Sequence, residues 1–264
     1  MSKPRTYQTE AVIIKKTKLR EADVIFTLYT PHLGKIQAFA KSVRKTRSKM
    51  AGHLELLTHS QVSLARGRNL DTIIGSQTIN SFLPLKSDLW LTSCGLYVIE
   101  LVNQFTADDV ENLTLFQLLG ATLEQLCRTA NRDLILRYFE LHLLDKAGYR
   151  PQLQQCVSCQ KTLEPEVNSF SSASGGMLCP DCAANHPSSH PVSINAQKIL
   201  RLLQNSDYST VERLKIDAVL SRELESVMSN YLKYLLEREI KSAAWLDMLR
   251  EQTKQPSPTS DPLP

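Results

Sequence analysis

The first 80 residues alternate between apolar and polar side chains over short runs, which is the pattern of half-buried β-strands. Between Asp23 and Thr30, one face carries Val24, Phe26 and Leu28, and the other carries Ile25, Thr27 and Tyr29. The other strand-like runs are Glu10–Lys15, Lys35–Lys41 (with Ile36, Ala38 and Ala40 on one face), Leu56–Ala65 and Leu70–Ile79. Turn signals fall at Pro31–Gly34 and at Gly67. Five short strands without a long helix between them predict a small Greek-key barrel such as the OB-fold.

After this region the apolar period changes to that of helices. Leucine-rich segments with steps of three and four residues cover Leu85–Val102, Leu115–Leu126 and Leu134–Leu144. Asp133 is predicted to cap the last of these helices, and Gly148 to end it. The helical pattern resumes at Asn195–Gln204 and Val219–Ile240, and Ser242–Arg250 could extend the latter helix.

We therefore predict an α+β protein in which a five-stranded OB-fold barrel precedes a mainly helical domain with a four-cysteine zinc module. The expected boundaries are 1–80 for the barrel, 81–150 and 191–250 for the two parts of the helical domain, 151–190 for the zinc module, and 251–264 for a disordered tail. The tail begins at Glu251 and is rich in Gln, Ser, Thr and Pro. The chain lacks a run of about 18 uncharged apolar residues and an N-terminal secretion signal, so we expect a cytoplasmic protein.

Four of the six cysteines form two C-x-x-C pairs, Cys156 with Cys159 and Cys179 with Cys182, separated by 19 residues. This spacing is typical of zinc sites, because two tight knuckles bring four thiolates to one tetrahedral ion. Four protein ligands leave no open position for water or substrate. We therefore predict one structural Zn²⁺ ion held by these four cysteines.

Two other interpretations of the cysteines fit the pattern less well. Redox-active pairs usually begin a helix beside a strand, and neither pair is predicted to do so. Zinc deaminases combine H-x-E with P-C-x-x-C, and His53-Leu-Glu55 matches the first element. That match lies roughly a hundred residues upstream in a β-rich region, and Leu178 rather than proline precedes Cys179. We therefore reject the deaminase interpretation.

Positive charge is concentrated in the first third of the chain. Residues 1–80 contain 14 Lys or Arg and 5 Asp or Glu, giving +9, whereas the remainder contains 17 basic and 22 acidic residues, giving −5. This asymmetry indicates a localised anionic partner, of which nucleic acid is the usual one. The candidate DNA-binding residues are Lys15, Lys16, Lys18, Arg20, Lys35, Lys41, Arg44, Lys45, Arg47, Lys49, Arg66 and Arg68.

These cations fall on consecutive loops of one barrel, where they would form a groove that follows a phosphate backbone. OB-folds add aromatic platforms for unpaired bases, and Phe26, Tyr29 and Phe39 are the candidates, although each could equally be core. No recognition helix or base-reading motif is evident, so binding should be independent of base sequence. The alternative is that the basic run Lys41–Lys49 is only a solvated loop.

Several longer stretches occur in a characteristic order: Glu21–Lys35 with a Lys/Arg-rich flap after it, Leu56–Arg68, Leu136–Leu144 with Ala147–Pro151, and the cysteine pairs with Phe170 and Gly175–Cys179 between them. In this order and spacing, over roughly residues 8–245, the chain resembles the RecO family of recombination mediator proteins. The resemblance implies an OB-fold, a helical domain and a zinc element. It also implies a role in bacterial DNA repair by homologous recombination, in a cytoplasmic, nucleoid-associated protein.

The resemblance further implies binding of single- and double-stranded DNA and annealing of complementary strands. It implies action with single-stranded-DNA-binding protein and a RecR partner to help load RecA. Family partners dock an acidic C-terminal peptide on the helical domain, and Arg137 matches the motif there; the alternative is an exposed helix charge. We expect no enzymatic activity. Two other classes stay open: a zinc-dependent nucleic-acid enzyme, and an adaptor without DNA contact whose basic face binds an acidic protein.

Overall fold

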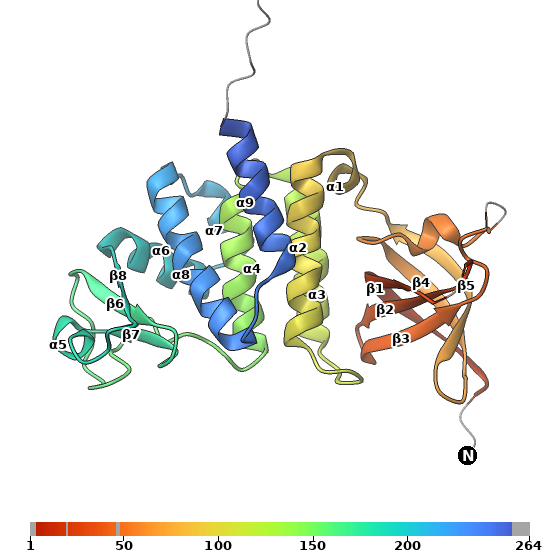
Figure 1. Ribbon diagram of the computed structural model, residues 1–264, viewed down its shortest axis with the longest axis horizontal. Coiled ribbons are helices and arrows are strands. Elements are labelled where there is room, and N and C mark those ends of the chain that lie inside the picture. Colours follow the sequence, from red (N-terminus) through yellow and green to blue (C-terminus); the bar gives the residue numbers. More distant parts are fainter. Residues whose placement is uncertain (1–3, 20, 46–47, 255–264) are drawn as a thin grey trace, which may run out of the picture.

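The computed structural model describes residues 4–19, 21–45 and 48–254. Figure 1 shows three parts in a row: a β-barrel formed by the N-terminal strands, a layer of helices, and a small module of short strands at the other end. The order of the elements confirms the predicted α+β class.

Five strands form the barrel: β1 (Thr6–Lys18), β2 (Val24–Thr30), β3 (Gly34–Ala40), β4 (His59–Ala65) and β5 (Asp71–Asn80). The sheet closes in the order β1-β2-β3-β5-β4, with β3 and β5 parallel and the other pairs antiparallel. Alternation turns one face of each strand inward, and the interior contains both predicted sets, Val24, Phe26 and Leu28 with Ile36, Ala38 and Ala40. This closed order is that of the predicted OB-fold barrel.

The helical part contains α1 (Leu83–Ser87), α2 (Leu89–Phe105), α3 (Leu113–Arg128), α4 (Arg132–Lys146), α6 (Ile194–Asn205), α7 (Tyr208–Arg213), α8 (Ala218–Leu236) and α9 (Lys241–Lys254). Apolar residues on the outer face of the barrel join the core of these helices. Val12, Ile14 and Tyr29 belong to the helical core cluster, and the ring of Tyr29 lies 6.4 Å from that of Phe116 on α3. Strands β1 and β2 are apolar on both faces because each face is buried, one inside the barrel and one against the helices.

Two predictions about the last helices are corrected. Helix α8 ends at Leu236, not at Ile240, because Glu237 takes a left-handed conformation with φ 52°. Helix α9 is not an extension of α8, since it lies beside α2, where the backbone N–H groups of Lys241 and Ser242 donate to the Glu100 carboxylate. The predicted tail from Glu251 begins inside α9, and residues 255–264 lie outside the described part of the chain.

Of the two predicted ends of α4, the N-terminal one is wrong and the C-terminal one is confirmed. Asp133 is not the N-cap, because the helix begins at Arg132 after Asn131; Asp133 lies in the first turn, where its charge interacts favourably with the helix dipole. At the other end α4 stops at Lys146, and Gly148 follows with φ +84°, which confirms it as the stop signal.

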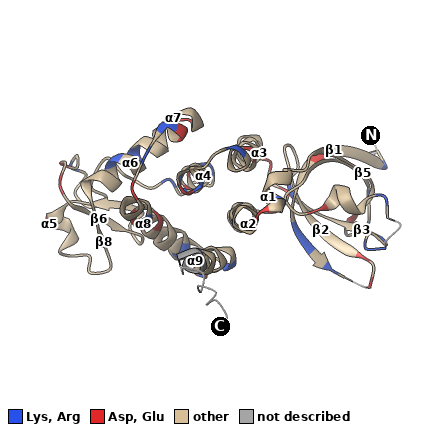
Figure 2. Ribbon diagram, turned by 90° about the horizontal axis from the view of Figure 1, so that it is seen from above, with Lys and Arg blue, Asp and Glu red and all other residues tan. Residues whose placement is uncertain are grey.

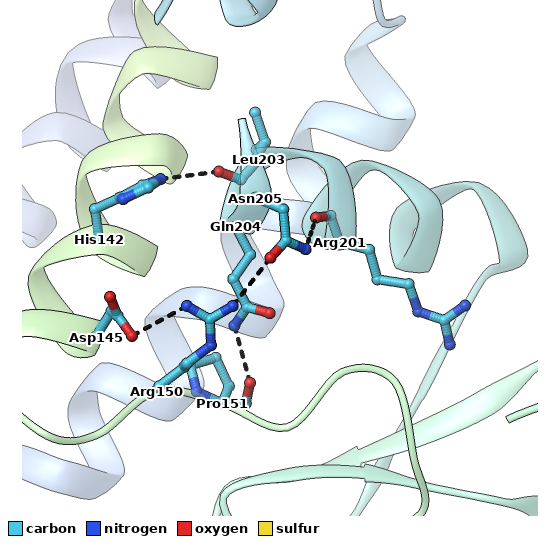
Figure 3. A network of polar contacts seen from close by, with 8 residues as sticks. All are labelled: His142, Asp145, Arg150, Pro151, Arg201, Leu203, Gln204 and Asn205. Carbon is cyan, nitrogen blue, oxygen red and sulfur yellow. Dashed lines mark hydrogen bonds and ion pairs between the residues drawn. The ribbon is translucent and has the colours of Figure 1, made fainter. Parts of the chain in front are cut away.

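The cysteine-bearing module consists of β6 (Asn168–Ser171), β7 (Gly176–Leu178), α5 (Pro180–Ala183) and β8 (His190–Val192). Polar contacts anchor the start of this module to the helices (Figure 3). The Arg150 guanidinium donates to Asp145 of α4 and to Asn205 of α6, both at 3.0 Å. Gln204 donates to the carbonyl of Pro151 at 2.9 Å. These contacts fix the path along which the chain leaves α4 and enters the module.

Candidate metal centre and nucleic-acid interface

The four cysteines predicted to bind metal converge on one point. Their Sγ atoms all lie within 4.8 Å of one another, and the Sγ atoms of Cys159 and Cys179 are 3.8 Å apart. A tetrahedral ion with metal–sulfur bonds of about 2.3 Å would hold its sulfurs about 3.8 Å apart. All four cysteines are free rather than disulfide-bonded. The donor set therefore fits one tetrahedral metal ion.

Local backbone structure positions both knuckles. Gln160 adopts φ +63°, which lets its N–H donate to the Cys156 carbonyl at 2.9 Å. Cys179 is the N-cap of α5, and the Ala183 N–H donates to its carbonyl at 2.9 Å. Between the knuckles Gly175, with φ +69°, makes the turn from β6 to β7.

The thiols of this cluster hold their protons unequally. Burial raises the pKa of Cys156, but hydrogen bonds from backbone groups of Cys159, Cys179 and Ser158 outweigh it and bring the pKa to about 6. A hydrogen bond with Ser158 lowers the pKa of Cys182, while the neighbouring sulfurs raise it to about 12. Four thiolates this close repel one another, and a bound cation removes that repulsion. Ser158 is a residue of the site that the cysteine spacing could not identify.

The prediction that neither cysteine pair begins a helix is wrong. Cys179 and Cys182 do lie at the start of a helix, α5, directly after strand β7. Redox chemistry is disfavoured on geometric grounds instead, because a redox pair needs two sulfurs and this site gathers four around one point. The H-x-E match is remote: His53 lies in the short 3₁₀ helix η1 (Ala51–Leu54) of the barrel, with its Nδ1 atom 2.8 Å from the Thr78 hydroxyl.

Two of the predicted basic segments meet at one end of the barrel. The strand register places Lys18 beside Val24 and Val24 beside Ala40, so the end of β1 adjoins the loop after β3. Arg44 of that loop donates its backbone N–H to the Ala22 carbonyl at 3.2 Å, and its guanidinium donates to the Glu21 carbonyl at 2.8 Å. We call this surface the basic end, and its described cations are Lys15, Lys16, Lys18, Lys41, Arg44, Lys45 and Lys49.

The basic end carries a net positive charge. In residues 15–25 and 41–55, the described positions contain seven Lys or Arg and three Asp or Glu. Lys16 forms an ion pair with Glu55 at 2.8 Å, whereas the other six cations are exposed. Figure 2 shows blue segments on the strands and loops of the barrel. Arg20 and Arg47, also predicted to bind DNA, lie outside the described residues. Exposed cations on adjoining loops attract phosphate groups.

Arg66 and Arg68 do not join the basic end. They follow β4, whose last residue Ala65 pairs with Thr6, so they lie at the opposite end of β1 from Lys18. The Arg66 guanidinium lies over the ring of Tyr7, 4.6 Å from its centroid. Arg66 and Arg68 are therefore separate from the basic end, and a single groove through all the basic clusters stays a prediction.

Lys35 is engaged within the protein. Its Nζ atom donates to the carbonyls of Asn103 at 2.9 Å and Thr106 at 2.6 Å, and it lies 3.2 Å from the Asp108 carboxylate. An ammonium group has three donors, so these contacts occupy them all. Lys35 ties β3 to the segment after α2 instead of facing solvent. The sequence could not reveal this, because two of the partners are backbone carbonyls far along the chain.

The three candidate aromatic platforms differ in exposure. Phe26 is 1% exposed inside the barrel, and Tyr29 is 0% exposed against the helices. Both are therefore core residues. Phe39 is half-buried and lies outside both core clusters.

Arg137 is not an exposed helix charge, since its side chain is only 5% exposed. Its guanidinium lies 2.5 Å from Glu140 and 3.7 Å from Glu225, and the Tyr97 hydroxyl donates to Glu140 at 2.7 Å. Burial raises the pKa of Glu140, and the charge of Arg137 opposes that shift. Arg137 and Tyr97 also line a cavity of about 250 Å³ beside α8 and α9. Glu140 was not among the residues predicted from the sequence, although its i+3 spacing from Arg137 on a helix was a usable signal.

Among the described residues no helix combines the length and hydropathy needed to cross a bilayer. Comparison with known proteins matches both halves of the chain. Residues 1–82 match the family model "Recombination protein O N terminal", and residues 86–244 match "Recombination protein O C terminal". The boundary between the two matches coincides with the end of the barrel and the start of the first helix.

Curated relatives can be aligned with this chain over nearly their full length. A "DNA repair protein RecO" of Dehalococcoides mccartyi (strain ATCC BAA-2266 / KCTC 15142 / 195) is 48% identical over 249 residues, which cover 94% of this chain and 98% of the relative. A protein of the same name from Roseiflexus sp. (strain RS-1) is 41% identical over 256 residues, covering 97% and 90%. The chain therefore belongs to the RecO family of DNA repair proteins.

Proposed function

We propose that this protein is a mediator of DNA repair and homologous recombination that binds single- and double-stranded DNA through its basic end. The proposal is carried by one observation, the convergence of seven described cations from two segments on one end of an OB-fold barrel. OB-folds bind oligonucleotides on the face of strands 2 and 3 and on the loops that connect strand 1 to 2 and strand 4 to 5. The basic end lies where β1 enters the first of these loops, beside β2 and β3, in a chain whose relatives are named DNA repair proteins.

Binding through these cations would be independent of base sequence. Lysine and arginine side chains on loops contact phosphates, which carry no sequence information. Each neutralised phosphate releases condensed counterions, so affinity should fall steeply with salt. A surface that neutralises two strands at once also lowers the repulsion between them, which favours annealing of complementary strands.

The family resemblance extends the proposal to partners. The protein would act on DNA coated with single-stranded-DNA-binding protein and, with a RecR partner, help to load RecA, in the cytoplasm where the bacterial nucleoid lies. Arg137 stays a candidate for docking an acidic peptide, because it lines a cavity. Glu140 and Glu225 already contact its guanidinium, so a peptide carboxylate would have to compete with Glu225.

Zinc is the proposed metal. Tetrahedral sets of four thiolates suit Zn²⁺ or iron–sulfur centres, and two C-x-x-C knuckles are the usual zinc arrangement. Cys156, Cys159, Cys179 and Cys182 would hold the ion, which would then link the two knuckles across β6 and β7. A full set of protein ligands supports a structural ion, and hence a protein without enzymatic activity.

The test is a binding titration with a matched control. The triple variant Lys41→Ala/Lys45→Ala/Lys49→Ala removes three exposed cations of the basic end. Its counterpart Lys161→Ala/Lys198→Ala/Lys215→Ala removes three exposed lysines that lie outside the barrel. For single-stranded DNA the salt slope should fall by about 0.7 per lost phosphate contact, or about 2 in the first variant. The second variant should bind like the wild type.

Three outcomes would contradict the proposal. If the wild type binds neither single- nor double-stranded DNA, the adaptor alternative is favoured. If both triple variants lose affinity equally, general charge and not the basic end governs binding. A nucleic-acid-modifying activity that chelation abolishes without unfolding would instead favour a zinc-dependent enzyme.

A further inference from the structure

Phe39 occupies the outer face of strand β3, next to the basic end. Its chain neighbours Ala38 and Ala40 are both 0% exposed inside the barrel, so the alternation of the strand directs Phe39 outward. The register places it between Ile25 of β2 and Thr72 of β5. The ring is half-buried, so it is supported by neighbouring side chains while part of it meets solvent.

Cations lie near this aromatic ring. Lys41 is exposed and directly follows the end of β3, two residues after Phe39. Lys15 is exposed and pairs with Thr27, two residues beyond Ile25 on β2. Ile74 of β5 is 53% exposed and adds a further apolar side chain near this face. An aromatic ring with apolar neighbours and flanking lysines suits a ligand that alternates flat bases with phosphates.

The other aromatic residues of the barrel cannot take this role. The sequence up to residue 80 contains four, namely Tyr7, Phe26, Tyr29 and Phe39. Phe26 and Tyr29 are buried. The Tyr7 hydroxyl donates to Asp71 at 2.6 Å, and its ring lies under Arg66, away from the basic end. Phe39 is thus the aromatic side chain that combines solvent access with a position beside the basic end.

We propose that Phe39 is the platform on which an unpaired base of single-stranded DNA stacks, while Lys15 and Lys41 contact the adjoining phosphates. The inference rests on the proposed function and adds strand selectivity to it. A base held in a duplex already stacks on its neighbours and cannot present its face to a protein ring, whereas an unpaired base can. The lysines act on both kinds of DNA, so Phe39 makes the basic end prefer single strands.

The experiment compares Phe39→Leu with Phe39→Trp in the full-length protein, using an oligo-dT strand and a duplex of equal length. Leucine keeps an apolar contact with Ile25 but removes the flat ring. Phe39→Leu should weaken single-strand binding by about 5- to 100-fold, the range for loss of one stacked base. Its duplex affinity should change by less than about twofold, and its salt slope should match the wild type because no phosphate contact is lost. Phe39→Trp should bind single strands at least as well as the wild type.

Tyr234→Leu is the matched control, since Tyr234 is an aromatic residue of α8 that is 52% exposed and far from the barrel along the chain. Tyr234→Leu should change neither the affinity for the oligo-dT strand nor the affinity for the duplex. If Phe39→Leu alters the melting profile, the Phe39→Trp variant decides the question. Its added fluorescence, above that of Trp90 and Trp245 in the wild type, should be quenched at saturation with oligo-dT.

Wild-type protein that binds no DNA would refute the proposed function itself. Wild-type protein that binds single strands while Phe39→Leu binds them equally well, or an introduced tryptophan that is not quenched, would overturn the stacking role alone.

Discussion

The buried ion pair of Arg137 and Glu140 gives a prediction whose size follows from the structure. Arg137→Met keeps much of the apolar stem of the side chain but removes its charge. The Glu140 side chain is 0% exposed, and after the change the Tyr97 hydroxyl would still donate to it but no cation would lie at hydrogen-bond distance among the described residues. Removing one partner of a buried pair costs about 3–5 kcal/mol, because the remaining carboxyl group must either stay charged without compensation or take up a proton. We expect a loss of that size in the free energy of unfolding.

The loss should depend on pH in a defined direction. Burial already raises the pKa of Glu140, and without Arg137 the pKa will rise further. A carboxyl group that is protonated when folded and ionised when unfolded stabilises the fold at low pH and loses that effect as pH rises. Above the pKa that Glu140 has in the unfolded chain, the variant's loss in free energy of unfolding relative to the wild type should grow by about 1.4 kcal/mol per pH unit. This holds as long as Glu140 stays protonated in the folded variant.

Urea denaturation followed by circular dichroism between pH 6 and pH 8 measures both effects. Arg222→Met is the matched control, because Arg222 lines the same cavity but is exposed, and its loss should be within about 0.5 kcal/mol. Adding Glu140→Leu to Arg137→Met should recover most of the stability, since an apolar pair replaces the ionic one. A loss below about 1 kcal/mol at pH 8 for Arg137→Met would refute the reasoning and favour a role for Arg137 outside the core.

Three further predictions test other parts of the account. Lys35→Met should lower the free energy of unfolding by about 2–3 kcal/mol through its lost hydrogen bonds, yet leave the salt dependence of DNA binding unchanged. Purified protein should contain one zinc per chain; a strong chelator should expose the metal module to proteolysis while helices α2–α4 keep their circular dichroism, and Cys179→Ser should abolish the bound metal. Burial lowers the pKa of His142 below 6.5, and its Nε2 donates to the Leu203 carbonyl at 3.1 Å, so stability from this group is complete above pH 6.5 and is lost as pH falls through the folded pKa. His142→Gln should therefore show a smaller loss of stability between pH 7 and pH 5 than the wild type, and an equal loss would contradict this assignment.

Much of the architecture was predictable because it depends on local patterns. The alternation in β2 and β3 correctly grouped the side chains that share a face, since a barrel strand turns every second side chain inward, but it could not tell which face is the inner one. The two C-x-x-C pairs identified the candidate metal-ligating cysteines, because each spacing brings two sulfurs together and the β6–β7 hairpin between the pairs brings the two knuckles together. The predictions that failed concern features that depend on tertiary contacts. Helical period could not separate α8 from α9, because the break is the left-handed conformation of one residue, Glu237.

Charge was the least reliable basis for predicting the role of an individual residue. The excess of cations before residue 80 was real, but the sequence could not tell a lysine that faces solvent from one that binds carbonyls. Lys35 is held by α2 and the segment after it, and Arg66 lies across Tyr7 at the other end of β1. Arg137 matched a family motif for partner docking, yet the fold places it in a buried ion pair. The role of each of these side chains is set by a contact with a residue far away in the sequence or by burial in the core, and neither can be read from the local sequence.

The most direct test of the central claim is the annealing of complementary DNA strands, measured with naked strands and with strands coated by single-stranded-DNA-binding protein. The account predicts that the wild type accelerates annealing in both cases. It predicts that Lys41→Ala/Lys45→Ala/Lys49→Ala loses this acceleration while Lys161→Ala/Lys198→Ala/Lys215→Ala keeps it. Annealing that the wild type does not accelerate, or that the basic-end variant accelerates as well as the wild type, would contradict the account.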